Sequence, residues 1–132
     1  MVKDFANKRN LKVIGISSRK DDNKWMRCLN RTNAGNFLYL INNADYVFTD
    51  SYHGSIFSIL YKKRFWTFER FHASDPICQN SRIEQLKRYF RLKNQMRSCD
   101  TINEMTIDYS FIYNKLNSLR NKSIDFLNNS LK

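Results

Sequence analysis

Apolar runs alternate with polar turns along most of the chain, and the lengths of these runs separate strands from helices. Three runs rich in β-branched or aromatic side chains predict buried strands, at residues 11–17, 46–50 and 65–68. Apolar residues at three and four spacing predict helices, at residues 37–43, 55–60, 81–90 and from about 110 onward. This alternation predicts an α/β fold, with a Rossmann-like parallel sheet and flanking helices in a single domain over residues 1–132.

The last two helices carry further signals. Ser81-x-x-Glu84 has the spacing of a capping box, in which the hydroxyl and the carboxylate satisfy backbone N–H groups at a helix start. Residues 107–109 are expected to be extended. The closing helix is expected to pack one apolar stripe inward, formed by Ile112, Leu116, Leu119, Phe126 and Leu127.

A polar turn between the second predicted strand and its helix is the best candidate for a ligand site. Residues 49–54 (Thr-Asp-Ser-Tyr-His-Gly) follow an apolar strand and precede an apolar helix. Parallel sheets bind ligands outside the carboxyl ends of their strands, and the following helix offers unpaired N–H groups to anions. His53 belongs to the residue type that ordinarily titrates near neutral pH, so proton transfer is one role for it.

Each residue of this turn also has a structural interpretation. His53 could instead bond a loop carbonyl, and the residues alone support both roles equally. Asp50 could orient His53, act as a base, or satisfy helix N–H groups. Ser51 is better explained as a helix cap than as an anion ligand. Gly54 permits either a close backbone approach or a positive φ. Ser55 could donate to an anion at the helix start.

Outside the turn, Arg82 could clamp a phosphate or carboxylate bidentately from the start of its helix, or be a surface arginine. Lys62, Lys63 and Arg64 are better explained as a solvated connector. The aromatic residues Phe65, Trp66 and Phe68 are expected in the core rather than on a sugar-binding surface.

The amino-acid composition indicates which kinds of ligand or partner the chain can bind. The 132 residues carry a net charge of +11, and 42% of them are hydrophobic, so a folded, strongly basic domain is expected. No nucleic-acid-binding motif accompanies the charge, and a solvated basic surface is therefore favoured over a nucleic-acid partner. Three widely spaced cysteines, at 28, 78 and 99, suggest neither zinc nor disulfides and favour a reducing cytoplasm. We expect no signal peptide, no membrane span and no metal site.

The segment Thr49-Asp-Ser-Tyr-His-Gly-Ser-Ile-Phe-Ser58 resembles the Thr-Asp-Ser-Phe-His-Gly-x-x-Phe-Ser signature of the polysaccharide pyruvyl transferase family. Tyr52 stands where that signature usually has Phe. Weaker similarity continues through residues 80–83 to the closing helix, so the resemblance runs from Ala44 to the end. It implies the carboxyl-terminal half of an enzyme built, as GT-B transferases are, from two facing Rossmann-like domains.

The resemblance also implies an activity. Such enzymes transfer a pyruvyl group from phosphoenolpyruvate to two hydroxyls of a sugar in a cell-surface polysaccharide, forming a cyclic ketal. Phosphoenolpyruvate is then the donor substrate, with no further cofactor, and the acceptor is a sugar or a lipid-linked oligosaccharide. His53 and Asp50 become catalytic candidates; Ser51, Gly54, Ser55 and Arg82 become substrate-binding candidates.

The expected setting is the bacterial cytoplasm, including the inner face of the membrane. The chain is expected to need an amino-terminal half or a second copy of itself. Two alternatives stay open: a glycosyltransferase-like half that holds a nucleotide sugar, and a non-catalytic basic module that binds a membrane surface, nucleic acid or a partner chain.

Overall fold

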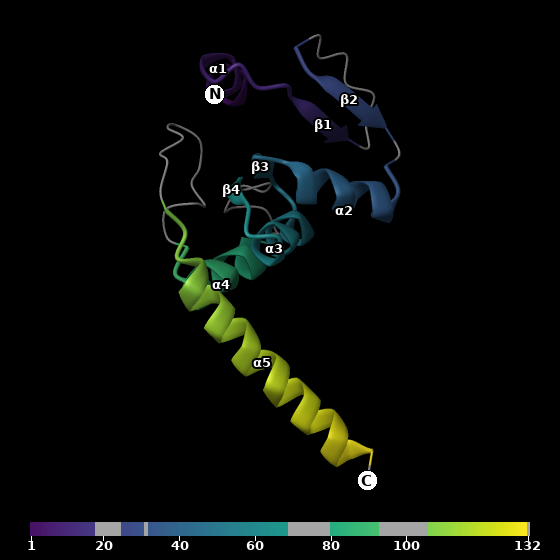
Figure 1. The fold of residues 1–132 in the computed structure, drawn as a ribbon, viewed down its shortest axis with the longest axis vertical. Coiled ribbons are helices and arrows are strands. Elements are labelled where there is room, and N and C mark those ends of the chain that lie inside the picture. Colours follow the sequence, from purple (N-terminus) through teal and green to yellow (C-terminus); the bar gives the residue numbers. More distant parts are fainter. Residues whose placement is uncertain (18–24, 31, 69–79, 93–105, 132) are drawn as a thin grey trace.

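The computed structural model describes residues 1–17, 25–30, 32–68, 80–92 and 106–131, which form an α/β arrangement (Figure 1). The elements are α1 (Val2–Lys8), β1 (Ile14–Ser17), β2 (Arg27–Asn30), α2 (Ala34–Asn43), β3 (Tyr46–Thr49), α3 (Tyr52–Leu60), β4 (Arg64–Thr67), α4 (Asn80–Phe90) and α5 (Tyr109–Ser130). The three predicted strands and four predicted helices are all present, so the α/β prediction is confirmed at this level.

The centre of the fold is a β–α–β unit. β3 and β4 pair in parallel, and α3 connects the end of the first strand to the start of the second. Parallel neighbours need such a crossover because the chain must return to the starting edge of the sheet. The polar turn and the basic connector therefore lie at the two ends of α3 within this one unit.

The expectation of one continuous sheet was wrong for the described residues. β1 pairs in parallel with β2, and β3 with β4, as two separate two-stranded sheets. The strand that the sequence pattern missed is β2, whose two end residues, Arg27 and Asn30, are polar and exposed. Only Cys28 and Leu29 lie partly buried in it, which is too short an apolar run to identify a strand. Cys28 is a free thiol, and Cys78 and Cys99 lie outside the described residues.

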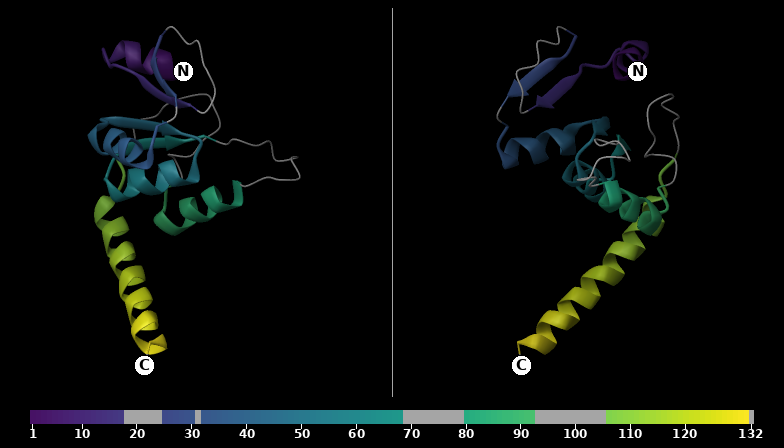
Figure 2. Two further views of the ribbon diagram at one scale, coloured as in Figure 1. Left: turned by 90° about the vertical axis from the view of Figure 1, so that its right-hand side faces the viewer. Right: turned by 180° about the vertical axis from the view of Figure 1, so that it is seen from behind.

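The two faces of the β3–β4 sheet are covered differently because side chains alternate along a strand. Phe65 on one face joins a core with Ile59 of α3, together with residues from α4 and α5. Trp66 on the other face stacks on Phe48 with ring centroids 4.9 Å apart, and Phe5 of α1 packs edge-on against both. Figure 2 shows the sheet between these two groups of elements. The core positions expected for Phe65 and Trp66 are confirmed.

Three helices end in the same way, with a residue other than glycine in the left-handed conformation. Asn10, Lys62 and Arg91 follow α1, α3 and α4 with φ of 52°, 54° and 55°. In each case the next residue's N–H returns to a carbonyl of the last helical turn, such as Lys63 to Ser58 at 2.8 Å. These are Schellman motifs, in which glycine is the residue most often found. Each left-handed residue ends its helix and changes the direction of the backbone toward the next segment.

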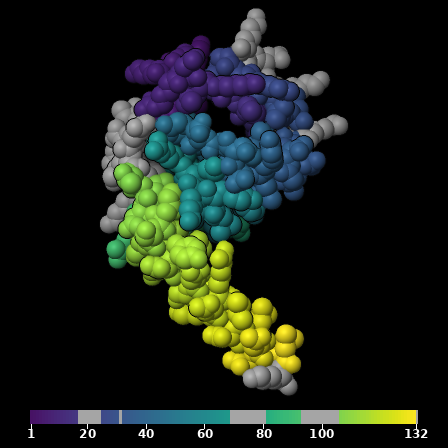
Figure 3. Space-filling model, in the orientation of Figure 1, coloured from purple at the N-terminus to yellow at the C-terminus, as the bar shows by residue number. Residues whose placement is uncertain are grey.

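The closing helix α5 packs inward over only part of its length. Ile112 is 2% exposed and belongs to the core, and Leu116 lies partly buried against it. Beyond that point the expected stripe is exposed, with Phe126 at 70% and Leu127 at 55%. Figure 3 shows this half of the helix extending away from the body. The prediction of a stripe packed along the whole helix is therefore corrected.

Two smaller expectations also change. α4 begins at Asn80, so Ser81 lies inside its first turn rather than at the cap, and Glu84 pairs with Lys87 at 2.6 Å. Of residues 107–109, which were expected to be extended, Tyr109 is instead the first residue of α5, and Asp108 caps that helix by accepting the N–H of Phe111 at 3.0 Å. Aspartate is a favoured N-cap residue, and its carboxylate stabilises the start of a helix at Tyr109 rather than an extended segment.

Candidate functional site

The polar turn lies where β3 ends and α3 begins, as the sequence predicted. Ser51 is the N-cap of α3, and its Oγ accepts the N–H of Gly54 at 3.4 Å. The capping interpretation of Ser51 is thus confirmed. An α-helix leaves the N–H groups of its first turn without intrahelical acceptors, so those of Tyr52 and His53 are oriented toward the turn. The positive end of the helix dipole adds to their attraction for an anion.

Two threonines hold the turn in place. Thr49 and Thr67 are register partners at the carboxyl ends of β3 and β4. Thr49 Oγ1 accepts the N–H of Ser51 at 3.1 Å, and Thr67 Oγ1 lies 2.7 Å from Ser55 Oγ. This pair was not among the candidate residues predicted from the sequence. The available signal was a threonine directly after the aromatic residues of each strand, at Phe48-Thr49 and Trp66-Thr67.

Ser55 stabilises the turn through its buried hydroxyl group. Its side chain is fully buried, and its hydroxyl donates to the Ser51 carbonyl at 3.1 Å besides meeting Thr67. Its N–H also bonds the Ser51 carbonyl, at 3.0 Å. In this structure the Ser55 hydroxyl therefore braces the helix start, and donation from Ser55 to an anion stays a prediction.

Gly54 is required by close packing and not by an unusual backbone angle. None of the described glycines has a positive φ. A Cβ on Gly54 would lie 2.3 Å from Thr49 Oγ1 and 3.1 Å from Thr49 Cβ. Of the two explanations that the sequence allowed, the structure selects the close approach of the helix to the strand.

His53 and Asp50 are the exposed groups of the turn. His53 is the second residue of α3, and its ring meets the Tyr52 ring edge-on with centroids 5.9 Å apart. Asp50 lies directly before the cap. An imidazole, a carboxylate and the first-turn N–H groups thus occupy one solvent-facing turn, where a small anion can reach them. That Asp50 orients His53 stays a prediction.

Arg82 is exposed on α4, in a different setting. It lines a cleft between α4 and α5 together with Arg88, Tyr89 and Lys115. None of the turn residues is among the described residues that line this cleft. Joint action of Arg82 with the turn also stays a prediction.

The described residues contain neither a metal-binding cluster nor a membrane-spanning helix. Among the described residues, no group of histidine, cysteine and acidic side chains is arranged to hold a metal ion. In the same part of the chain, no helix is both long and apolar enough to span a bilayer.

Comparison with known proteins supports the resemblance of the turn. A sequence model of the family described as "Polysaccharide pyruvyl transferase" matches residues 2–70, just over half of the 132 residues. The match includes the turn but ends before residues 80–83 and the closing helix, so the weaker similarities noted there lie outside it. No curated protein and no solved structure gives a significant match. The chain belongs to the polysaccharide pyruvyl transferase family.

Proposed function

We propose that this chain supplies the donor-binding half of an active site that transfers a pyruvyl group from phosphoenolpyruvate to a sugar of a cell-surface polysaccharide. The observation that carries the proposal is the exposed His53 at the start of α3, within a turn whose sequence carries the family signature. The coarse assignment, a transferase of this family, rests on the family match. The donor and the residue roles are proposals.

The reaction requires an acid, a base and an anion site. The methylene carbon of phosphoenolpyruvate takes up a proton and becomes a methyl group, which makes C2 electrophilic. Two sugar hydroxyls then form bonds to C2 while its bond to the phosphate oxygen breaks. One hydroxyl proton balances the new methyl group, and the other leaves with inorganic phosphate. The two proton transfers need groups within hydrogen-bond reach of the methylene and of the hydroxyls.

The turn contains groups suited to these steps. His53 is assigned the proton transfer to the methylene carbon, and Asp50 the base role. The first-turn N–H groups of α3, with Ser51 beside them, are assigned the carboxylate or phosphate of the donor. Gly54 contributes by letting α3 pack close to Thr49 of β3, and Ser55 by joining α3 to Thr67 of β4. Arg82 is assigned to an anionic part of the substrates, after closure of the site by a further domain.

We further propose that the chain acts as a carboxyl-terminal half, in the two-domain manner of GT-B transferases, on a sugar or lipid-linked acceptor at the cytoplasmic face of the membrane. The exposure of His53 supports this, because a ketal-forming site needs walls that exclude water and hold two substrates. A second chain, or an amino-terminal half, would provide those walls.

A nucleotide sugar is the alternative ligand, because a helix N-terminus also suits a diphosphate. An NMR titration of the labelled chain with phosphoenolpyruvate and with a uridine diphosphate sugar distinguishes the two ligands. A titration with citrate is the control for unspecific binding of a polyanion. We expect selective shifts at residues 50–55 with phosphoenolpyruvate, and these should be lost in His53→Asn. The control is Asn42→Ala, at an exposed position on α2, which should retain the shifts. Preference for the nucleotide sugar would favour the alternative, and equal shifts with citrate would refute a specific donor site.

A further inference from the structure

A second charged cleft lies at the other end of the β3–β4 sheet. Its volume is about 690 Å³, and it opens at the first residues of both strands, Tyr46 and Arg64. The signature turn follows the last residues of the same strands. Because a strand rises about 3.3 Å per residue, the two sites are roughly 10 Å apart along the sheet. The cleft is lined by Arg9, Leu11, Ala44, Asp45, Tyr46, Lys62, Lys63 and Arg64.

Four cations and one acid line this cleft, which leaves a formal charge of +3 there. They come from three segments: the residues after α1, the start of β3, and the α3–β4 connector. From the sequence, the three connector residues looked like a solvated loop. The fold places them beside Arg9, more than fifty positions earlier in the chain. Like charges gathered in one concave surface concentrate the electrostatic potential and attract anions.

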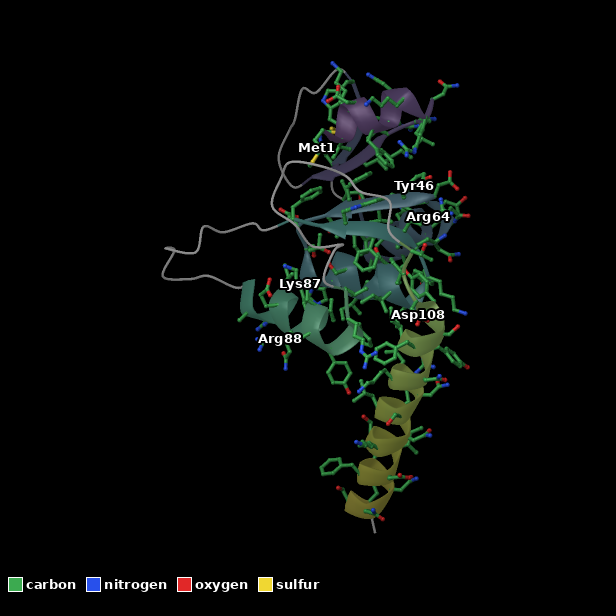
Figure 4. The ribbon with its side chains drawn as sticks, turned by 90° about the vertical axis from the view of Figure 1, so that its left-hand side faces the viewer. Met1, Tyr46, Arg64, Lys87, Arg88 and Asp108 are labelled. Carbon is green, nitrogen blue, oxygen red and sulfur yellow. The ribbon has the colours of Figure 1, made fainter. Side chains whose placement is uncertain are left out.

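Aromatic rings position both guanidinium groups of the cleft. Arg64 donates from Nη1 to the Tyr46 hydroxyl at 3.3 Å, and its Cζ lies 5.8 Å from the centroid of that ring. Arg9 Cζ lies 4.0 Å from the centroid of the Phe5 ring. The two rings meet edge-on, with centroids 5.1 Å apart. Figure 4 shows Tyr46 and Arg64 together at this edge of the sheet.

This arrangement reduces the freedom of two otherwise flexible side chains. The Phe5–Tyr46 ring pair is part of the packed aromatic face of the sheet, so the guanidinium groups rest on a rigid base. Guanidinium groups present planar pairs of N–H donors that fit phosphate oxygens. Lys62 and Lys63 also line the cleft and add positive charge to it, while the Lys62 ammonium lies 5.5 Å from the centroid of the Tyr113 ring of α5. Two oriented guanidinium groups with further positive charge beside them suit a ligand that carries more than one phosphate.

We propose that this cleft is a second anion site, which binds a diphosphate group. Its position at the opposite end of the strands separates it from the donor site proposed above, and it does not depend on that assignment. The diphosphate has two chemical sources, a soluble ester and a lipid head group, and both present the same oxygens to the cleft.

The test is a titration of the full chain with inorganic pyrophosphate, followed by amide and arginine side-chain NMR signals. We expect saturable shifts at Tyr46 and Arg64, with affinity reduced about tenfold or more in Arg9→Gln/Arg64→Gln, since each charge-assisted bond contributes substantially. The control is Arg120→Gln/Lys122→Gln, which removes the same charge from exposed positions on α5 and should bind as the parent does.

Equal weakening in both double variants would overturn the proposal, because binding would then follow net charge alone. Absence of saturable shifts would overturn it as well. If the cleft variant unfolds, Arg64→Lys replaces it: this change keeps the charge but removes the fork, and unchanged affinity would refute the guanidinium geometry. Sedimentation with vesicles that contain diacylglycerol diphosphate, a lipid with a diphosphate head group, then distinguishes the sources. Vesicle binding that needs Arg9 and Arg64 indicates a lipid ligand. Binding of pyrophosphate but not of vesicles indicates a soluble ester.

Discussion

Replacement of Gly54 by alanine tests whether the close approach of α3 to β3 builds the candidate site. The added Cβ would lie 2.3 Å from Thr49 Oγ1 and 3.2 Å from Thr49 Cγ2, while ordinary contacts begin near 3.4 Å. Thr49 would have to move by about 1 Å, since overpacked side chains in a tight core can only shift or strain. That movement breaks the 3.1 Å bond that Thr49 Oγ1 accepts from Ser51.

The expected magnitude follows from three contributions. Overpacking costs about 1–3 kcal/mol, and loss of one hydrogen bond costs about 1 kcal/mol. The higher helix propensity of alanine offsets this loss of stability by roughly 1 kcal/mol. The free energy of unfolding should therefore fall by about 1–3 kcal/mol, or roughly 4 °C in Tm per kcal/mol for a chain of this size. Urea unfolding followed by circular dichroism measures it.

Gly35→Ala is the matched control, because Gly35 also lies in the first turns of a helix. A Cβ there would meet only Asn33 Oδ1, at an ordinary 3.6 Å. This variant should be more stable by about 0.5–1 kcal/mol, so the two glycine changes have opposite signs. Thr49→Ala removes Oγ1 and Cγ2, which would lie 2.3 Å and 3.2 Å from the added Cβ, and should partly rescue Gly54→Ala. A Gly54→Ala chain as stable as the Gly35→Ala chain would refute the packing explanation.

Three further predictions follow from other parts of the fold. Lys62→Gly should raise the free energy of unfolding by up to about 1 kcal/mol in urea, because glycine adopts the left-handed angle without strain; an unchanged or lower value would contradict this. Burial raises the pKa of Tyr109 above its ordinary value, so its contribution to stability is complete below about pH 10 and is lost as pH rises through the folded-state value. Tyr109→Phe should abolish that alkaline loss in unfolding curves measured between pH 9 and 12, whereas the exposed Tyr113→Phe should retain it. Ile112→Ala should cost about 2–5 kcal/mol and Phe126→Ala less than about 0.5 kcal/mol by the same urea assay; similar losses would mean that the outer half of α5 is covered in solution.

The sequence alone determined the local structure of the candidate site. An apolar strand, a polar turn and an apolar helix are encoded by residues 46–60, and Ser51 caps the helix as its position predicted. The family signature within the same residues identified the class of protein, and the family match supports it. These features were readable because caps, helical spacing and strand propensity depend on neighbours within about four positions.

Tertiary structure decided which residues meet. The sequence could not show that β1 pairs with β2 apart from the central sheet, or that α5 packs inward only near Ile112. It allowed Gly54 two explanations, and only the position of Thr49 selects one of them. Arg9 and Arg64 are also far apart in the sequence, near opposite ends of the region that the family model matches, yet both line one cleft. The physical reason is that packing and electrostatic potential depend on surfaces brought together by folding, whereas propensity and capping depend on adjacent residues.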